Sequence, residues 1–450
     1  MDLLGFGGFR SPADDPPKPW PAFAGAATRR QAQVGMVLGD HGLARGAPSP
    51  GEGLEERRMK MEESQKNRIC AFFSPTMILL GFNAVERIGA EAKKLGGSKA
   101  CIVTDEGVVK AGFVDRIRNP LKNEGIEVEV FGRVEAEPPV RVVDECSEFI
   151  RKGKYDLIVG LGGGSSLDTA KGAAIMGTRQ GSVREICGMD IIPKRGIPKI
   201  LIPTTGGTGA EATRAFVVTD EEEGIKRVSY SNYNLPDLAI IDPMLTVSMP
   251  SKVTADTGID ALVHAIESFV SFNRTPFSDL LALEAIRLIS RSLPAAYSKG
   301  EDLSARYDMS FAALLAGMSI SSGGLGAVHA LAYPIGTEFH QNHGRSNGII
   351  LPHVMEFNLT GNTMRYGVIA STMGEQIGGL NGLEAAEKSV VAVKRLLEMI
   401  HISYRLKDYG IPKESIPKLV EGGMKQSRLF VPNPRNLTQD DVTAIYTKAW

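Results

Sequence analysis

Three of the chain's seven histidines lie in one short stretch, GLGAVHALAYPIGTEFHQNHG, at residues 324–344. They are His329, His340 and His343, and most of the residues between them are apolar or glycine. Imidazole is the commonest metal ligand among side chains, and its ordinary pKa lies close to neutral pH. The cluster therefore points to a metal centre or a proton-transfer site, although any single histidine is as well explained as a hydrogen-bonded core residue.

A carboxylate and a fourth histidine lie upstream in the stretch TADTGIDALVHAIE. Asp260 and His264 are four residues apart, so they share one face of a helix. Asp256 lies one further turn back and competes with Asp260 as the carboxylate of a site; it could also cap the helix near Gly258. Taken alone, such a pair is more often an ordinary hydrogen bond than a pair of ligands.

Taken together, the two stretches supply one carboxylate and three imidazoles, from Asp260, His264, His329 and His343. This donor set suits a divalent transition metal such as Fe²⁺ or Zn²⁺. The set contains no thiolate, which argues against a structural zinc site. The chain's four cysteines are scattered without a CxxC pair and are expected to be reduced.

A glycine-rich loop in LIVGLGGGSSLDTAKGAA follows an apolar run and precedes a helical pattern. Gly162, Gly163 and Gly164 allow a sharp turn and a close approach to a ligand. The N–H groups at the start of the following helix suit a pyrophosphate. Ser165 stands at the third glycine of the GxGxxG pattern and the GK[ST] ending of a P-loop is absent, so a structural turn is an equally good explanation of the motif alone.

A second glycine-rich loop, PTTGGTGAEAT at residues 203–213, follows another apolar run. It offers hydroxyl groups and unhindered backbone, from Thr204, Thr205 and Thr208 and from Gly206, Gly207 and Gly209. By itself the loop could be a helix-capping turn. Two such loops at the ends of adjacent parallel strands favour a nucleotide-binding cleft, because ligands bind at the carboxyl edge of these sheets.

The elements that must position these groups follow from the periodicity of the sequence. Apolar runs of strand length occupy residues 100–107, 155–164 and 198–207, and residues 125–132 alternate between apolar and polar; helical spacing lies between them, as at 140–153. Short buried strands alternating with helices predict an α/β fold with a parallel, doubly wound sheet. After residues 238–250 the strand pattern stops, and three-to-four spacing predicts a helical second half.

These patterns divide the chain into three predicted parts. Residues 1–66 are rich in Pro, Ala, Gly and charge, which is typical of a disordered extension. Residues 67–246 are predicted to form a dinucleotide-binding α/β domain, and residues 247–450 a helical, metal-binding catalytic domain. The stretch CAFFSPTMILLGF is a candidate edge strand between subunits, so we expect a homo-oligomer, a dimer or larger.

Composition excludes several classes of partner. Hydrophobic residues make up 43% of the chain, charged residues 23%, and the formal net charge is -1. This balance argues against nucleic-acid binding, which needs a basic face. No apolar run approaches the roughly 20 residues that cross a bilayer. We therefore expect a cytoplasmic protein that acts on small molecules.

Six motifs carry a resemblance to a known family: GGGSSLDTAK, PTTGGTGAEAT, DPMLTVSMP, TGIDALVHAIESFVS, GLGAVHALAYPIG and HGRSNGIILPHVMEFN. In their order and spacing, over about residues 72–450, the chain resembles the iron-dependent (group III) alcohol dehydrogenases, the family of lactaldehyde reductase and 1,3-propanediol dehydrogenase. The resemblance implies a Rossmann-like N-terminal domain and an all-α C-terminal domain, the dehydroquinate synthase-like arrangement. It also implies a metal in the cleft between them.

The resemblance assigns roles to individual residues. The implied metal ligands are Asp260, His264, His329 and His343, which decides for Asp260 over Asp256. The implied cofactor contacts are Asp105, Gly162, Gly163, Gly164, Ser165, Asp168, Thr204, Thr205, Thr208, Val217 and Lys226. Asp105 is implied to bind the adenosine ribose, whereas the general rule for dinucleotide folds would place that acid near Glu185.

Two positions depart from the family pattern. Tyr333 stands where relatives often carry a second histidine that exchanges protons with solvent, and Glu137 stands where relatives often have Asn before a proline. A phenol is a poor proton carrier at neutral pH. Tyr333 and His340 are therefore the candidate catalytic residues, with His340 as the relay and direct exchange with water as the alternative.

The implied activity is reversible hydride transfer between NAD(H) and a small alcohol or aldehyde at a divalent metal, Fe²⁺ first and Zn²⁺ second. Candidate substrates include a diol or an anionic short-chain aldehyde, either sulfonated or derived from a hydroxy acid. Arg274 and Arg345 lie near the metal motifs in the sequence. They are candidates for holding an anionic substrate, and solvated surface arginines are at least as good an explanation.

Two other functions are compatible with parts of the sequence. A dehydroquinate synthase-like lyase also uses NAD and a metal, but it needs a lysine and arginine cluster for a substrate phosphate, which the helical half lacks. A non-catalytic metal- or nucleotide-binding protein is the second alternative. The complete ligand set and the two loops argue against it.

Overall fold

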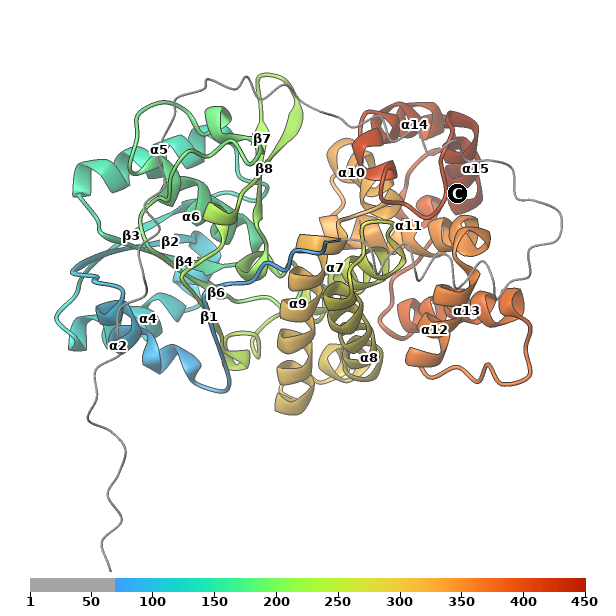
Figure 1. Ribbon diagram of the computed structural model, residues 1–450, viewed down its shortest axis with the longest axis horizontal. Coiled ribbons are helices and arrows are strands. Elements are labelled where there is room, and N and C mark those ends of the chain that lie inside the picture. The colour runs from blue at the N-terminus through green and yellow to red at the C-terminus, as the bar shows by residue number, and fades with distance from the viewer. Residues whose placement is uncertain (1–68) are drawn as a thin grey trace, which may run out of the picture. The chain divides into compact units, whose positions relative to one another are not determined.

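The computed structural model describes residues 69–450, and these form one compact unit. The extension predicted for residues 1–66 lies outside the described residues. The first described segment passes the helical part of the unit, where the Ala71 carbonyl accepts a hydrogen bond from the Ser322 hydroxyl at 3.2 Å, and then enters the sheet (Figure 1).

The main sheet has six parallel strands in the order β1-β9-β6-β4-β2-β3. Their bounds are β1 Met77–Leu80, β2 Lys99–Asp105, β3 Glu127–Val134, β4 Leu157–Gly162, β6 Lys199–Pro203 and β9 Leu238–Ile241. The central strands are buried along their whole length, which is why they appear in the sequence as continuous apolar runs. β1 is an edge strand, and its pairing between subunits stays a prediction.

Helices cover both faces of this sheet, as Figure 1 shows. They are α2 Ile88–Lys94, α3 Glu106–Lys110, α4 Phe113–Asn123, α5 Val140–Gly153 and α6 Gly164–Met176. Alternate residues of one strand pack on opposite layers: Ile102 joins the cluster with α2 and α4, and Cys101 joins the cluster with α5 and α6. The predicted doubly wound α/β fold is confirmed.

A smaller three-stranded sheet was not expected from the sequence. It has the order β5-β8-β7, with β5 Gly188–Met189, β7 Ala215–Asp220 and β8 Ile225–Tyr230. β7 and β8 form an antiparallel hairpin, in which Val217 pairs with Val228. The hairpin lies on the side of the α/β part that faces α10 (Figure 1). It therefore brings residues of the α/β part toward the helical part.

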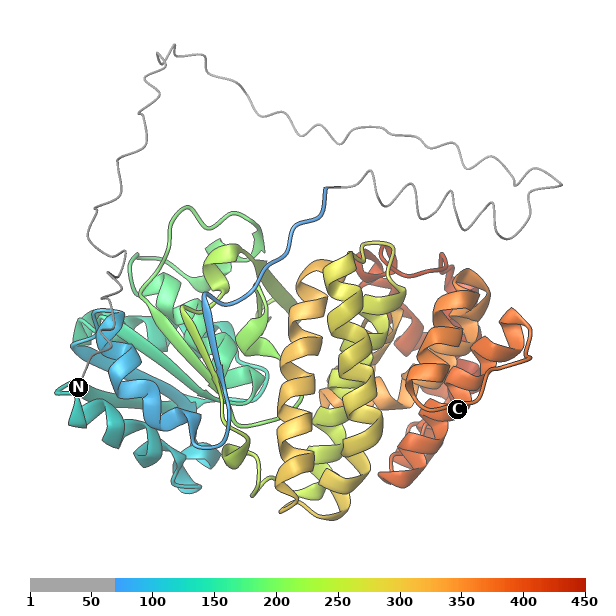
Figure 2. The same cartoon turned by 60° about the horizontal axis from the view of Figure 1, so that its bottom comes forward.

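From Ser251 onward the regular structure is helical. The α-helices are α7 Ser251–Val270, α8 Pro276–Ser298, α9 Leu303–Gly323, α10 Ala327–Phe339, α11 His343–Asn358, α12 Thr363–Thr372, α13 Gly382–Met399, α14 Ile416–Met424 and α15 Gln439–Ala449. α8 and α9 run side by side next to the sheet (Figure 2). The last strand ends at Ile241, and the domain boundary at residues 246 and 247 stays a prediction.

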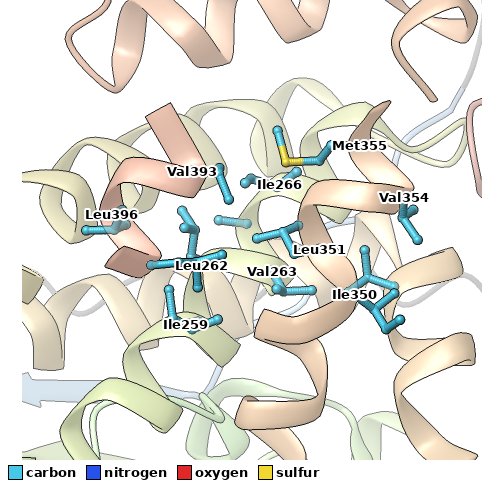
Figure 3. Close-up of a cluster of buried hydrophobic side chains, with 14 of the residues drawn as sticks. Ile259, Leu262, Val263, Ile266, Ile350, Leu351, Val354, Met355, Val393 and Leu396 are labelled. Carbon is cyan, nitrogen blue, oxygen red and sulfur yellow. The ribbon is translucent and has the colours of Figure 1, made fainter. Parts of the chain in front are cut away.

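The core of the helical part surrounds α7. Figure 3 shows side chains from α7, α11 and α13 packed together: Ile259, Leu262, Val263, Ile266, Ile350, Leu351, Val354, Met355, Val393 and Leu396. Every residue of α7 from Ile259 to Val270 is buried, so this helix has no solvated face in that stretch. Burying charged or polar groups in such a helix is unfavourable unless they are paired. Asp260, His264 and Glu267 must therefore have partners.

Within residues 69–450, no single helix is both long and apolar enough to cross a membrane. α9 and α10 meet the length and composition test only as a pair, and they are bent by 112° at the break between them. Most residues of both helices are buried inside the protein.

Candidate metal and cofactor site

The four predicted metal ligands meet at one point in the helical part. Asp260 Oδ1 lies 3.9 Å from His264 Nε2, 3.8 Å from His329 Nε2 and 3.5 Å from His343 Nε2. The ligand atoms of Asp260, His329 and His343 all lie within 4.8 Å of one another. His264 joins them through the ring of His329, on which it stacks with the centroids 4.9 Å apart. α7, α10 and α11 each contribute to the group.

The donor set and its spacing fit a transition metal. Two ligand atoms bound tetrahedrally at about 2.1 Å from one ion lie about 3.4 Å apart, close to the distances found here. Burial lowers the pKa of His264 to about 4 and also lowers the pKa of His343. Burial raises the pKa of Asp260, but the three imidazoles outweigh it and the net pKa is lowered. Neutral imidazoles at His264 and His343 beside an ionised Asp260 are in the protonation state that binds a metal.

Glu267 orients one of these histidines. Its Oε2 accepts the Nδ1–H of His329 at 2.6 Å and the backbone N–H of Gly326 at 2.9 Å, and its Oε1 accepts the N–H of Val328 at 2.6 Å. This carboxylate therefore fixes the His329 tautomer and leaves Nε2 free to bind a metal. Burial opposes the protonated form of His329, but Glu267 and Asp260 raise its pKa overall. The sequence analysis missed Glu267, although it lies one helical turn after His264.

Asn347 is a second residue that the sequence analysis missed. Its side-chain nitrogen donates to Asp260 Oδ1 at 2.7 Å and lies 3.3 Å from His329 Nε2 and 3.4 Å from His343 Nε2. Its side-chain oxygen is buried without a hydrogen-bond partner. Asn347 follows His343 by one helical turn, and that spacing could have identified it. The amide holds three of the ligand groups in place.

Asp256 is neither a metal ligand nor a helix cap; its carboxylate binds residues at the start of α11. Its Oδ1 accepts from Arg345 Nε at 2.6 Å, and its Oδ2 accepts from Asn342 Nδ2 at 3.1 Å. At Gly344 a Cβ would lie 1.9 Å from the Asp256 carbonyl oxygen, so only glycine allows this approach of α11 to α7. These contacts seat the start of α11 against α7 and bring His343 to the site. Arg345 is thus a structural partner of Asp256.

A cavity of about 290 Å³ opens from this cluster toward the carboxyl edge of the sheet. Of the predicted site residues, its lining includes Gly164, Ser165, Asp168, Thr208, Val217, Lys226, Asp260, His264, His329, Tyr333 and His343. Both halves of the compact unit thus line one cavity. A ligand in it contacts the start of α6, the β7–β8 hairpin and the candidate metal ligands together.

In the first glycine loop, Gly164 and the following Ser165 line the cavity, whereas Gly162, Gly163 and Asp105 do not. Gly162 has φ +144°, and a Cβ there would meet the Ser166 hydroxyl at 2.6 Å. Asp105, at the end of the neighbouring strand β2, accepts from Ser166 Oγ at 3.1 Å and from the Val108 N–H at 3.0 Å. Asp105 therefore lies beside the first glycine loop, where a ribose next to the pyrophosphate would be placed.

The second glycine loop makes different contacts. A Cβ at Gly207 would lie 2.5 Å from Thr257 on α7, and a Cβ at Gly209 would lie 2.6 Å from the Ala313 carbonyl oxygen on α9. The glycines of this loop therefore dock the α/β part against the helices. Three threonines of this loop were predicted to contact the cofactor. Thr208 lines the cavity, whereas Thr204 and Thr205 do not.

Asp168 and Lys226 brace the hairpin. Asp168 Oδ2 accepts from the Val217 N–H at 2.9 Å, and burial raises the pKa of Asp168 to about 6. Lys226 Nζ pairs with Glu137 Oε2 at 2.8 Å. Glu137, which replaces the asparagine common in relatives, therefore neutralises the charge of Lys226, a predicted cofactor contact. Glu137 itself has φ +51° and lines the cavity.

The two candidate catalytic residues lie in different surroundings. Tyr333 lines the cavity and stacks on His343 with the ring centroids 5.6 Å apart. Burial raises the pKa of the Tyr333 phenol, which makes it a still poorer proton carrier. His340 ends α10 with φ +53°, is exposed and does not line the cavity. The relay role of His340 stays a prediction.

Family models and relatives agree with this site. Residues 75–243 match the model described as iron-containing alcohol dehydrogenase, and residues 254–450 match the C-terminal model of the iron-containing alcohol dehydrogenase family. The chain belongs to the iron-containing alcohol dehydrogenase family. It is an oxidoreductase, an NAD-linked alcohol dehydrogenase or aldehyde reductase of that family. The family match favours this activity over the lyase and the non-catalytic alternatives.

Three similar proteins show the breadth of the family. Long-chain-alcohol dehydrogenase 1 of Geobacillus thermodenitrificans is 42% identical over 84% of this chain and 95% of its own length. Sulfoacetaldehyde reductase of Bilophila wadsworthia is 34% identical over 82% of this chain and 96% of its own length. A crystal structure of 1,3-propanediol oxidoreductase, 38% identical, superposes with a TM-score of 0.83 over 85% of this chain and 100% of its own.

Proposed function

We propose that this protein transfers a hydride reversibly between NAD(H) and a small alcohol or aldehyde at a metal held by Asp260, His264, His329 and His343. The observation that carries the proposal is the meeting of one ionised carboxylate and three imidazoles at a cavity that Gly164 and Ser165 of the first glycine loop also line. The donor set accepts Fe²⁺ first and Zn²⁺ second, because it contains nitrogen and oxygen without sulfur.

The residues of this chain provide position and electrostatics. A bound metal would supply Lewis acidity toward the substrate oxygen, and the nicotinamide would supply or accept the hydride. Glu267 and Asn347 hold the ligands in place through short hydrogen bonds. The hairpin, braced by Asp168 through Val217, closes the cavity on the other side. The hydroxyl proton leaves by way of His340 or directly to water.

The cofactor is NAD(H) in preference to NADP(H). Asp105 would accept a hydrogen bond from a ribose hydroxyl and repel a 2′-phosphate. The substrate is a small diol, a simple alcohol or an anionic short-chain aldehyde; relatives are named for a diol and for sulfoacetaldehyde, and one is named for long-chain alcohols. Arg345 does not select among these, because its guanidinium pairs with Asp256 and does not line the cavity.

Substitution of one ligand tests the proposal. We expect His264→Ala to lose bound metal and to lower kcat/KM by more than about 100-fold, since even partners of metal ligands contribute 10- to 100-fold. His401→Ala is the control, because His401 is exposed and contacts Tyr297 away from the cavity. Metal content is measured by elemental analysis and turnover by NADH absorbance. Full metal content and an unchanged rate in His264→Ala would refute the ligand assignment.

The proton route has its own test. If His340 is the relay, His340→Ala lowers the rate of alcohol oxidation most near neutral pH, external imidazole partly restores it, and metal content does not change. Tyr333→His would then tolerate the loss of His340. Identical pH profiles for the parent and His340→Ala would assign the proton to water.

A further inference from the structure

Arg428 places a positive charge at the cavity that the proposed reaction does not use. It lies in the short 3-10 helix Ser427–Phe430, between α14 and α15, and it lines the cavity. It is exposed to solvent, whereas Asp260 and His329 are buried. The guanidinium is therefore more accessible to an entering ligand than Asp260 and His329 are.

The other lysine and arginine side chains that line this cavity form ion pairs, and among the described residues Arg428 has no carboxylate partner. Arg214 pairs with Asp190, and Lys226 pairs with Glu137. Across residues 69–450, no carboxylate forms an ion pair with Arg428. Since the two neighbouring cations are neutralised, Arg428 supplies the uncompensated positive charge of the protein at this end of the cavity.

Two tyrosines line the cavity together with Arg428: Tyr230, at the end of β8, and Tyr333, on α10. The guanidinium lies within hydrogen-bonding reach of the Tyr230 hydroxyl. Tyr333 stacks on His343, so this wall lies at the metal end of the cavity. The start of α6, with Gly164 and Ser165, is the part of the cavity suited to the cofactor pyrophosphate.

A guanidinium that lines one cavity together with two phenols suits an oxyanion. Arginine presents a planar fork of donors that matches carboxylate and sulfonate geometry, and each phenol adds one O–H donor. We propose that Arg428, with the hydroxyls of Tyr230 and Tyr333, binds the anionic group of the substrate, so that the protein prefers short-chain aldehydes carrying a carboxylate or a sulfonate. This inference rests on the proposed function, because the aldehyde end must lie at the metal ligands.

Paired substrates test this selectivity. Kinetics are measured with succinic semialdehyde against pentanal, and with sulfoacetaldehyde against propanal, each with NADH. We expect the parent to prefer the anionic member of each pair, and the two pairs to show which oxyanion fits better. We expect Arg428→Gln to lower kcat/KM for the anionic aldehydes by about 10- to 100-fold, mainly through KM, the range for a hydrogen bond to a charged group. Neutral aldehydes should be unaffected.

Lys425→Gln is the matched control. It removes a positive charge three residues away, on a side chain that is 69% exposed, pairs with Glu421 and does not line the cavity. We expect it to leave all four substrates unchanged. The dissociation constant of NADH, measured by fluorescence, should be equal in the parent and Arg428→Gln. Weaker NADH binding in Arg428→Gln would assign Arg428 to the cofactor, and equal losses for charged and neutral aldehydes would also overturn the inference.

A binding measurement separates this inference from the proposed function. Propionate and ethanesulfonate are titrated by calorimetry into the full chain without NADH. We expect the parent to bind at least one of them, Arg428→Gln to bind it at least about tenfold more weakly, and Lys425→Gln to match the parent. A parent that binds these anions through Arg428 but reduces no aldehyde would contradict the proposed function. A parent that reduces aldehydes without any preference for charge would contradict only the inference.

Discussion

The loop after β4 and the loop after β6 both leave the carboxyl edge of the sheet through a run of glycines, but these glycines face different neighbours. A Cβ at Gly163 would make ordinary contacts, 3.7 Å from Thr205 at the nearest. A Cβ at Gly209 would lie 2.6 Å from backbone atoms of α9. A side chain at Gly163 would fit without displacing protein atoms, whereas Gly207 and Gly209 in the second loop leave room for α7 and α9. Composition alone does not distinguish these uses.

The largest effect is expected in the second loop. Gly209→Ala puts a side chain at φ +59° and against the α9 backbone, so we expect the free energy of unfolding to fall by about 3 kcal/mol. Thermal unfolding followed by circular dichroism measures the change. A Tm equal to that of the parent would show that the loop does not dock the two halves.

In the first loop, we expect a substitution to weaken NADH binding and to leave stability unchanged. Gly163→Ala has space in the protein but would intrude on a bound pyrophosphate, so we expect the NADH dissociation constant to rise about tenfold or more. Its Tm should stay close to that of the parent. If Gly163→Ala destabilised the fold as much as Gly209→Ala while binding NADH normally, the contrast between the loops would be lost.

Substitution of Asp105 tests whether the cofactor ribose lies beside the first loop. Asp105→Gly removes the carboxylate that would repel a 2′-phosphate, so the ratio of kcat/KM for NADPH to that for NADH should rise about tenfold. The same change removes the cap on α3, at a cost of a few tenths of a kcal/mol. Asp105→Asn keeps an oxygen acceptor for the cap and is the stability control. A parent that already prefers NADPH would refute the assignment.

Thr208 should give the smallest effect. It belongs to the docking loop but lines the cavity. Thr208→Ala removes one hydroxyl, which also accepts from the Ala210 N–H at 3.3 Å. We expect NADH binding to weaken about threefold, as for one neutral hydrogen bond, with little change in Tm. Unchanged NADH affinity would mean that the second loop contributes only to packing.

Much of the fold could be predicted because its signals are local. The strands β2, β4 and β6 fall within apolar runs to within one residue, since central parallel strands are buried on both faces. β3, at the edge of the sheet, alternates between exposed and more buried residues, which is the alternation seen in its sequence. The β7–β8 hairpin escaped prediction. β7 begins with only four consecutive apolar residues, 215–218, β8 is mostly polar or charged, and the loop between the strands carries three glutamates, so the apolar signal is short. The formation of a partly buried hairpin depends on the segments that pack against it, and these are distant in the sequence.

The sequence by itself determined the α/β and helical halves, and the spacing that puts Asp260 and His264 on one helix face. The family resemblance then named the ligand set that the structure brings together. Only the tertiary structure decided that Asp256 pairs with Arg345 and that Glu267 holds His329. Likewise, only the fold placed Arg428 opposite a hairpin far from it in the chain. Helical periodicity reports which residues share a face, but the partner of a buried charge is set by packing between segments distant in sequence.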